Sequence, residues 1–169
     1  PRHPPRRVNF KNMSRRRRAV RRAIAEDAKY HSVLVARLIN KVMKWGQKSK
    51  AQKIVHRAFD VLAEKNPGVE PMAIVQRAID NVKPRLEVKA RRVGGATYQV
   101  PLEVPVDRQI SLAIRWIVAL ADARKGMPME NALANEISEA AQGQGSAIRK
   151  RDDMHRMAQA NKAFAHFRW

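Results

Sequence analysis

The spacing of apolar residues changes once along this chain, and that change limits the folds available to it. Most of the chain repeats apolar residues every three or four positions, the pattern of an α-helix with one buried face. Six stretches show this pattern, at residues 35–43, 51–62, 72–82, 110–121, 129–141 and 146–165. Between the third and fourth, apolar and polar residues alternate on either side of Gly94-Gly95, which is typical of a β-hairpin. The sequence therefore predicts a mainly α fold: a six-helix, bundle-like domain with one protruding two-stranded β-hairpin between the third and fourth helices, at about residues 85–105.

The register of the hairpin depends on the length of its turn. A two-residue turn at Gly94-Gly95 would place apolar side chains opposite polar ones along the ribbon. A three-residue turn at 94–96 instead pairs Arg92 with Tyr98 and keeps one face of the ribbon apolar. We therefore expect the three-residue turn or an equivalent bulge.

The fourth helical stretch has the widest apolar face. Leu112, Trp116 and Leu120 broaden its stripe, which predicts a helix buried at the centre of the domain. Asp107 is the expected N-cap of this helix, and Pro71 is expected in the first turn of the third helix.

The charge balance narrows the choice of partner. There are 35 Lys and Arg residues against 15 Asp and Glu, a formal net charge of +20. Such a surplus favours a polyanion, with nucleic acid the first choice and an anionic membrane surface the second. The apolar fraction of 44% is enough for a core. No apolar run approaches the roughly 18–20 residues of a membrane span.

Half of the net charge lies in the first 22 residues, which contain ten basic and no acidic side chains. Arginine-rich segments often become ordered on RNA. We therefore expect residues 1–30 to form a basic, largely extended arm and residues 31–169 a single helical RNA-binding domain. A solubilising tail or a localisation signal is the alternative. The start lacks the apolar core of a secretory signal, and Ser14 is its only serine, unlike a Ser-rich transit peptide.

Residues that could support catalysis or bind metal form no recognisable pattern. The chain has no cysteine, and no two of its five histidines have the i, i+4 spacing of a zinc site. Residues 46–49 lack the adjacent glycine and lysine of a phosphate-binding loop. Asp152 and Asp153 lie beside Arg151 and Arg156 and are expected to pair with them on one helix. We expect neither an enzyme nor a cofactor.

Basic residues gather in three further places. Lys89, Arg91 and Arg92 precede the glycine turn of the hairpin, the last helix carries five cations, and lysines surround the first turn between helices. The alternative is a solvated surface, or charges that protect an edge strand. Phe164 is expected to pack the last helix down. Residues 126–148 carry three glutamates and no Lys or Arg, so we expect them to face away from phosphates.

A basic arm, a basic ribbon and a basic terminal helix suit an irregularly folded RNA better than a straight duplex. No pair of helices resembles a compact helix-turn-helix. A DNA-compacting protein and a membrane-active basic protein remain the competing classes.

Three separated motifs resemble one known family. They are residues 82–101 (VKPRLEVKARRVGGATYQVP), 113–116 (AIRW), and 155–158 (HRMA) with 160–166 (ANKAFAH). In order and spacing they resemble ribosomal protein seven of the small subunit, of the bacterial and organellar type. The resemblance runs from about residue 13 to 169, whereas residues 1–12 depart from the family pattern.

The resemblance implies six helices with a protruding hairpin, and a structural constituent of the small ribosomal subunit in a bacterium or an organelle. It implies a primary binder of the 3′ major domain of small-subunit (16S-type) rRNA, which nucleates assembly of the head. It also implies a place near the E site, where the hairpin and the last helix approach tRNA and mRNA. The implied protein partners are small-subunit proteins nine and eleven.

The expected site residues follow from the basic segments and from the positions that match the family motifs. Those expected to bind rRNA are Arg15, Arg16, Arg17, Arg18, Arg21, Arg22, Lys48, Ser49, Lys89, Arg91, Arg92, Arg108, Arg115, Arg149, Lys150, Arg156 and Lys162. Those expected near tRNA or mRNA are Arg92, Gly94, Gly95, Lys150, Arg151 and Arg168.

Overall fold

The computed structural model describes residues 23–167, which form six α-helices and one β-hairpin. The elements are α1 (Val33–Val42), α2 (Lys48–Lys65), α3 (Pro71–Val82), β1 (Leu86–Val93), β2 (Ala96–Glu103), α4 (Val106–Ala123), α5 (Met129–Ala141), α6 (Ser146–Ala160) and a short 3-10 helix, η2 (Lys162–Phe167). The order and kind of elements confirm the predicted fold class, with the hairpin between α3 and α4. Within the described part of the chain, no helix is long and apolar enough to cross a membrane.

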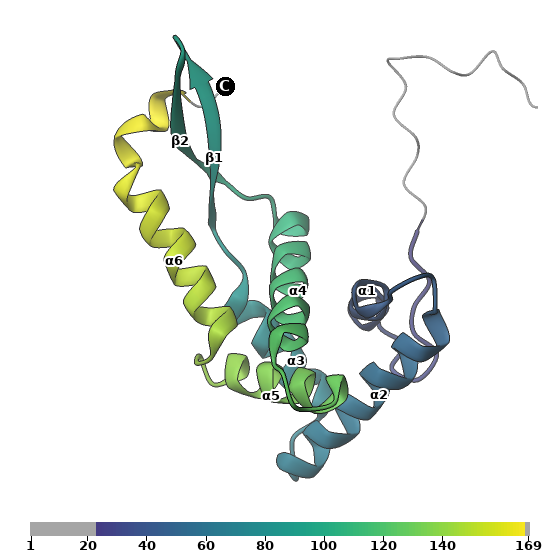
Figure 1. Ribbon diagram of the computed structural model, residues 1–169. Helices are drawn as coiled ribbons and strands as arrows, with labels where there is room; N and C mark the ends of the chain where they lie inside the picture. Colours follow the sequence, from purple (N-terminus) through teal and green to yellow (C-terminus); the bar gives the residue numbers. More distant parts are fainter. Residues whose placement is uncertain (1–22, 168–169) are drawn as a thin grey trace, which may run out of the picture.

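Helix α4 lies at the centre of the molecule, as predicted. It packs against α1, α3, α5 and α6, and it buries Leu112, Trp116 and Ile117. Figure 1 shows α6 and the hairpin on one side of α4 and α1 on the other. The predicted N-cap is wrong, because α4 begins at Val106 and the backbone carbonyl of Pro105 accepts the first helical hydrogen bonds. Asp107 instead lies in the first turn, where a carboxylate favours the positive end of the helix dipole.

The predicted hairpin register is also wrong. The turn has two residues, so that Val93 pairs with Ala96 and Val88 with Pro101. Both turn glycines have positive φ, +56° and +89°, and a two-residue turn of this kind matches the twist of the strands. Val100 and Pro101 are both buried, although consecutive side chains of a strand point to opposite faces. Both faces of the hairpin are therefore covered at its base. Apolar side chains can be buried on either face, so a register that keeps them all on one face is not required.

Helix α6 and η2 support the hairpin along its length. The rings of Tyr98 in β2 and Phe164 in η2 lie 5.1 Å apart, which confirms the packing expected of Phe164. At the start of the hairpin, the backbone N–H of Arg85 donates a hydrogen bond to Nε2 of His155 in α6, at 3.0 Å. The ribbon and α6 therefore form one protrusion (Figure 1).

The contact between His155 and Arg85 predicts a pH dependence. Burial lowers the pKa of His155, and the positive charge of Arg151 lowers it further. The unfolded chain, in which a histidine has a pKa of about 6.5, therefore binds more protons than the folded one just below that value. Stability is expected to fall as the pH drops below about 6.5, because protonated Nε2 can no longer accept the hydrogen bond.

Urea unfolding at pH 7.5 and pH 5.5 measures this effect. The His155→Gln variant keeps an acceptor but does not titrate, so it is expected to lose less stability than the wild type between the two pH values. An equal loss in both proteins would contradict the assignment to His155.

The chain before α1 is attached to α2. Asp27 is 4% exposed, and its carboxylate accepts hydrogen bonds from Nε2 of His56 at 3.1 Å and from the backbone N–H of Lys29 at 3.1 Å. Burial by itself raises the pKa of Asp27, but the hydrogen bonds outweigh it and hold the pKa below its usual range. Of the arm proposed for residues 1–30, the segment 27–30 therefore lies against the helical body.

The glutamates of residues 126–148 do not form an acidic face. Glu136 is completely buried, and Nη2 of Arg124 donates to its carboxylate at 2.5 Å. Arg124 also donates to Glu139 at 2.6 Å, and its hydrogen bonds to Glu139 and Glu136 hold the pKa of Arg124 above its usual range. The other Glu136 oxygen accepts the backbone N–H of Ala147 at 2.9 Å, in the first turn of α6. Glu136 therefore joins three helices at the base of the protrusion, and the expectation that residues 126–148 face away from phosphates stays a prediction.

Candidate nucleic-acid interface

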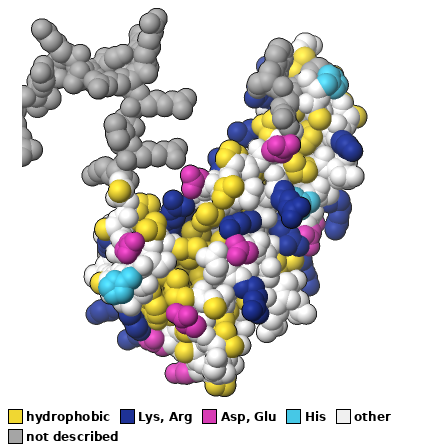
Figure 2. Space-filling model, turned by 180° about the vertical axis from the view of Figure 1, so that it is seen from behind, with side chains coloured by type: hydrophobic (Ala, Val, Ile, Leu, Met, Phe, Trp, Pro, Cys, Tyr) yellow, Lys and Arg dark blue, Asp and Glu magenta, His cyan; other side chains and the backbone are white. Residues whose placement is uncertain are grey.

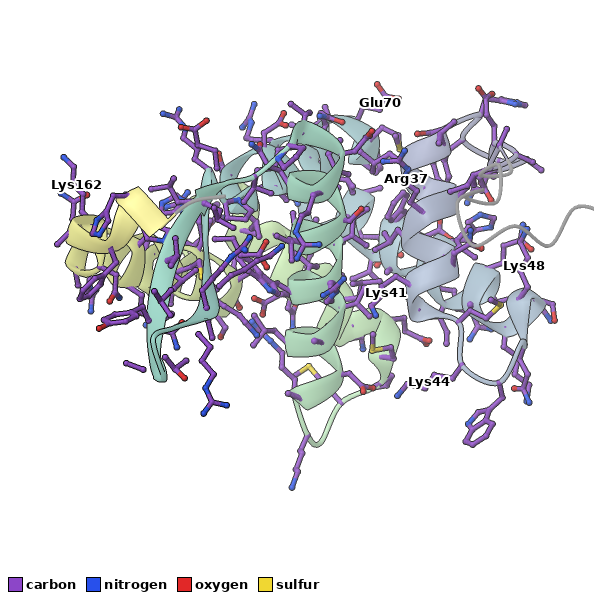
Figure 3. The ribbon with its side chains drawn as sticks, turned by 90° about the horizontal axis from the view of Figure 1, so that it is seen from above. Arg37, Lys41, Lys44, Lys48, Glu70 and Lys162 are labelled. Carbon is purple, nitrogen blue, oxygen red and sulfur yellow. The ribbon has the colours of Figure 1, made fainter. Side chains whose placement is uncertain are left out.

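Three cations lie on the side of α1 that faces α4 and just beyond its end. Arg37 and Lys41, four residues apart, share one face of α1, and Lys44 follows in the turn after the helix ends at Val42. Figure 3 shows Arg37 and Lys41 on the side of α1 toward α4. From α4, Arg115 faces the same space, because Lys41 and Arg115 line the same two neighbouring hollows. Cations from two helices that are distant in sequence are thus brought together.

The two hollows form a groove between α1 and α4. One hollow, of about 420 Å³, lies toward the start of α2, and the other, of about 640 Å³, lies toward Ile24 and the start of α4. We call this surface the α1–α4 groove, defined by Arg37, Lys41, Lys44 and Arg115. Figure 2 shows hydrophobic side chains along the middle of the molecule with lysine and arginine beside them.

Two carboxylates lie at the edges of the groove. Nζ of Lys44 is 2.9 Å from Asp122, and Arg37 is 3.7 Å from Asp107. Lys44, Asp122 and Asp107 are all more than half exposed at the side chain. Exposed pairs of this kind contribute little to stability, so both cations can exchange their partner for a phosphate at small cost.

Most of the expected residues at the hairpin are exposed, whereas Arg108 also holds the hairpin to α4. Lys89, Arg92 and the two turn glycines are exposed, and Arg91 is partly buried. Arg108 makes two hydrogen bonds with the carboxylate of Glu87, both at 2.7 Å, which fasten the base of β1 to α4. The same bonds hold the pKa of Glu87 below its usual range, so its charge persists in mild acid. Arg108 therefore has a structural contact besides the rRNA contact expected of it.

The expected cations of α6 and η2 are mostly on the surface. Arg149, Lys150, Arg156 and Lys162 are exposed, and Nζ of Lys150 lies 5.9 Å from the ring centre of Trp116. Arg151 is less accessible, because it donates to the backbone carbonyl of Asn81. It also pairs with Asp152, and Arg156 pairs with Asp153, as the sequence predicted.

The expected site residues that the structure describes thus form two groups. Lys48, Ser49 and Arg115 belong to the region of α1, α2 and α4. The others lie in the protrusion made of the hairpin, α6 and η2, except Arg108, which joins the hairpin from α4. The expected residues Arg15, Arg16, Arg17, Arg18, Arg21, Arg22 and Arg168 lie outside the described residues.

Sequence reasoning did not single out the groove cations at α1. Arg37 and Lys41 fall opposite the apolar stripe of the helix, and Lys44 lies in the turn after it. The shared helix face of Arg37 and Lys41 was a visible signal. What the spacing could not show is that α4 lies beside this face and adds Arg115 to it.

Cations that face one another across a groove, together with a basic ribbon beside a basic helix, are the electrostatic footprint of a nucleic-acid-binding protein. Comparison with known proteins narrows this class. The family described as ribosomal protein S7p/S5e matches residues 14–162. The chain therefore belongs to the ribosomal protein S7p/S5e family, whose members are structural proteins of the ribosome and not enzymes.

Curated relatives agree with this family over nearly the whole chain. The chain is 59% identical over 157 residues to the small ribosomal subunit protein uS7 of Akkermansia muciniphila, covering 93% of this chain and 100% of the relative. It is also 59% identical over 155 residues to the proteins of the same name from Kosmotoga olearia and Thermotoga neapolitana, covering 92% of this chain and 99% of each relative. This chain is accordingly a structural component of the small ribosomal subunit.

Proposed function

We propose that this protein is a primary binder of the 3′ major domain of small-subunit rRNA and nucleates assembly of the head. The α1–α4 groove is the observation that carries the proposal, because cations from two helices face one space in the folded chain. The net charge of +20 and the family membership support it. Binding then depends on shape and electrostatics, with phosphates neutralised along preformed surfaces.

The protrusion is assigned to a second RNA surface near the E site. We propose that Arg92, Gly94 and Gly95 at the hairpin tip approach tRNA or mRNA, together with Lys150, Arg151 and Arg168. The exposed glycine turn allows close approach of its backbone to a phosphate or ribose. Small-subunit proteins nine and eleven are the proposed protein neighbours.

Salt dependence tests the proposed rRNA binding. If about eight phosphates are neutralised, the logarithm of the affinity for a 3′ major domain fragment should fall with the logarithm of the salt concentration at a slope of roughly −6 to −7. Filter binding between 50 and 300 mM KCl gives this slope. A slope near zero would contradict the proposal.

Removing two groove cations should weaken binding in a defined way. The double variant Lys41→Ala, Arg115→Ala is expected to flatten the salt slope by roughly 1.5, and to lower the affinity about 30-fold at 0.1 M salt. The double variant Lys65→Ala, Lys125→Ala removes the same charge from exposed positions outside the groove. If both double variants lost affinity equally, overall charge rather than the groove would explain binding.

A further inference from the structure

One end of the α1–α4 groove is a hollow with apolar walls. Its volume is about 420 Å³, and it lies between α1, α2 and α4. Small-molecule sites typically have volumes of about 300–1,000 Å³. The apolar residues of its walls are Val42, Ala51, Ile54, Val118 and Met129. A surface that contacts only the phosphate backbone of a nucleic acid would not require apolar walls.

Cations surround these apolar walls. Lys41, Lys44, Lys50 and Arg115 all line the hollow, and Gln47 adds an amide that can both donate and accept hydrogen bonds. Asp122 also lines the hollow and pairs with Lys44 at 2.9 Å. An apolar side chain of a protein partner would cover the walls but bring no anion to Lys41, Lys50 and Arg115. An unpaired nucleotide fits both features, because its base has apolar faces and a polar edge and its flanking phosphates are anionic.

The turn between α1 and α2, which contributes Lys44 and Gln47 to the hollow, also carries an exposed tryptophan. Trp45 is 95% exposed and lies between these two residues in the sequence. Its φ of +57° lies in the left-handed region, which is unusual for a bulky residue and often marks a functional position. The turn is held by a hydrogen bond from the backbone N–H of Gln47 to the carbonyl of Lys44, at 3.1 Å. An indole held out from a basic turn is a surface on which a base can stack.

We propose that this hollow receives one unpaired nucleobase of the bound RNA, with Lys41, Lys44, Lys50 and Arg115 holding the phosphates on either side. This inference rests on the proposed RNA binding and deepens it. The groove then recognises an unstacked base in addition to the charge of the backbone.

Filling the hollow without changing charge tests the inference. Ala119 lines the hollow from α4 and is exposed, so Ala119→Trp adds bulk there without disturbing the core. Ala73→Trp is the matched control, an exposed helical alanine on α3 that does not line either hollow of the groove. Affinity is measured for the 3′ major domain fragment and for a fully paired RNA duplex, and circular dichroism confirms the fold of both variants.

Ala119→Trp is expected to weaken binding to the fragment by roughly tenfold, which corresponds to the loss of one stacked base. Binding to the duplex and the salt slope should stay unchanged, and Ala73→Trp should resemble the wild type with both RNAs. Normal fragment binding by Ala119→Trp would overturn the inference, as would an equal loss with both RNAs. A variant that binds RNA normally but fails to enter small subunits would indicate a protein partner and overturn it too.

A second experiment changes the RNA instead of the protein. Each unpaired nucleotide of the fragment is replaced in turn by an abasic nucleotide, and one position should reproduce the loss caused by Ala119→Trp. Combining that position with Ala119→Trp should cost no more than either change alone, because both remove the same contact. If no position has this property, the inference is wrong. The affinity of the wild type for the unmodified fragment tests the proposed function separately.

Discussion

Replacing Glu136 with alanine is expected to lower the free energy of unfolding by about 3–5 kcal/mol, the range for breaking a buried ion pair. The change removes a completely buried carboxylate from Arg124 and leaves the N–H of Ala147 without its acceptor. It also leaves a cavity among helices α4, α5 and α6, which adds to the loss. Urea unfolding followed by circular dichroism measures the difference.

Glu130→Ala is the matched control on the same helix. Glu130 lies 3.7 Å from Arg57, whose side chain is largely exposed, so its loss should cost no more than about 1 kcal/mol. Similar losses in the two variants would show that Glu136 has no special structural role. In Glu136→Ala, hydrogen exchange at the amide of Ala147 should also become faster, since this N–H is released at the start of α6.

Deleting residues 1–22 is expected to reduce rRNA affinity by roughly 1,000-fold at 0.1 M salt. The deletion removes ten cations, and if four of them contact phosphates the salt slope should become less steep by about 3. The fold should persist, because the buried residues of the described chain begin at Asp27 and the contacts of Asp27 with α2 are kept.

Thermal unfolding and filter binding together test this deletion. The melting temperature should be unchanged while affinity falls. Replacing Arg15, Arg16, Arg17 and Arg18 with glutamine keeps the chain length and should reproduce part of the loss, which separates charge from length. Unchanged affinity after the deletion would contradict a role of the segment in RNA binding.

The parts of the fold that depend on residues close together in the sequence were predictable. Pro71 is at the first position of α3, as its fixed φ and missing N–H predict, and the apolar stripe of the fourth helix identified α4 as central. The hairpin register was not predictable in the same way. It depends on the cover that α6 and η2 provide, and contacts such as that between Tyr98 and Phe164 join segments far apart in the sequence.

The candidate site was predictable by residue type but not by arrangement. The basic positions of the hairpin and of α6 were identified, and most of those described are exposed. The groove was missed because it exists only once α1 packs beside α4. The burial of Glu136 was not predictable for a similar reason, since it depends on Arg124 from the end of α4 and on the start of α6.

Helix α4 connects the two cationic surfaces. Arg108 and Arg115 are seven residues apart, or two turns, so they lie on one face about 10 Å apart along the axis. Arg108 is tied to the hairpin through Glu87, and Arg115 lines the groove. Once a ligand is bound at one surface, its binding to the other surface is intramolecular and takes place at a high effective concentration. Because α4 holds the two surfaces at a fixed distance, two weak binding contacts can together bind one ligand more tightly than either contact could alone.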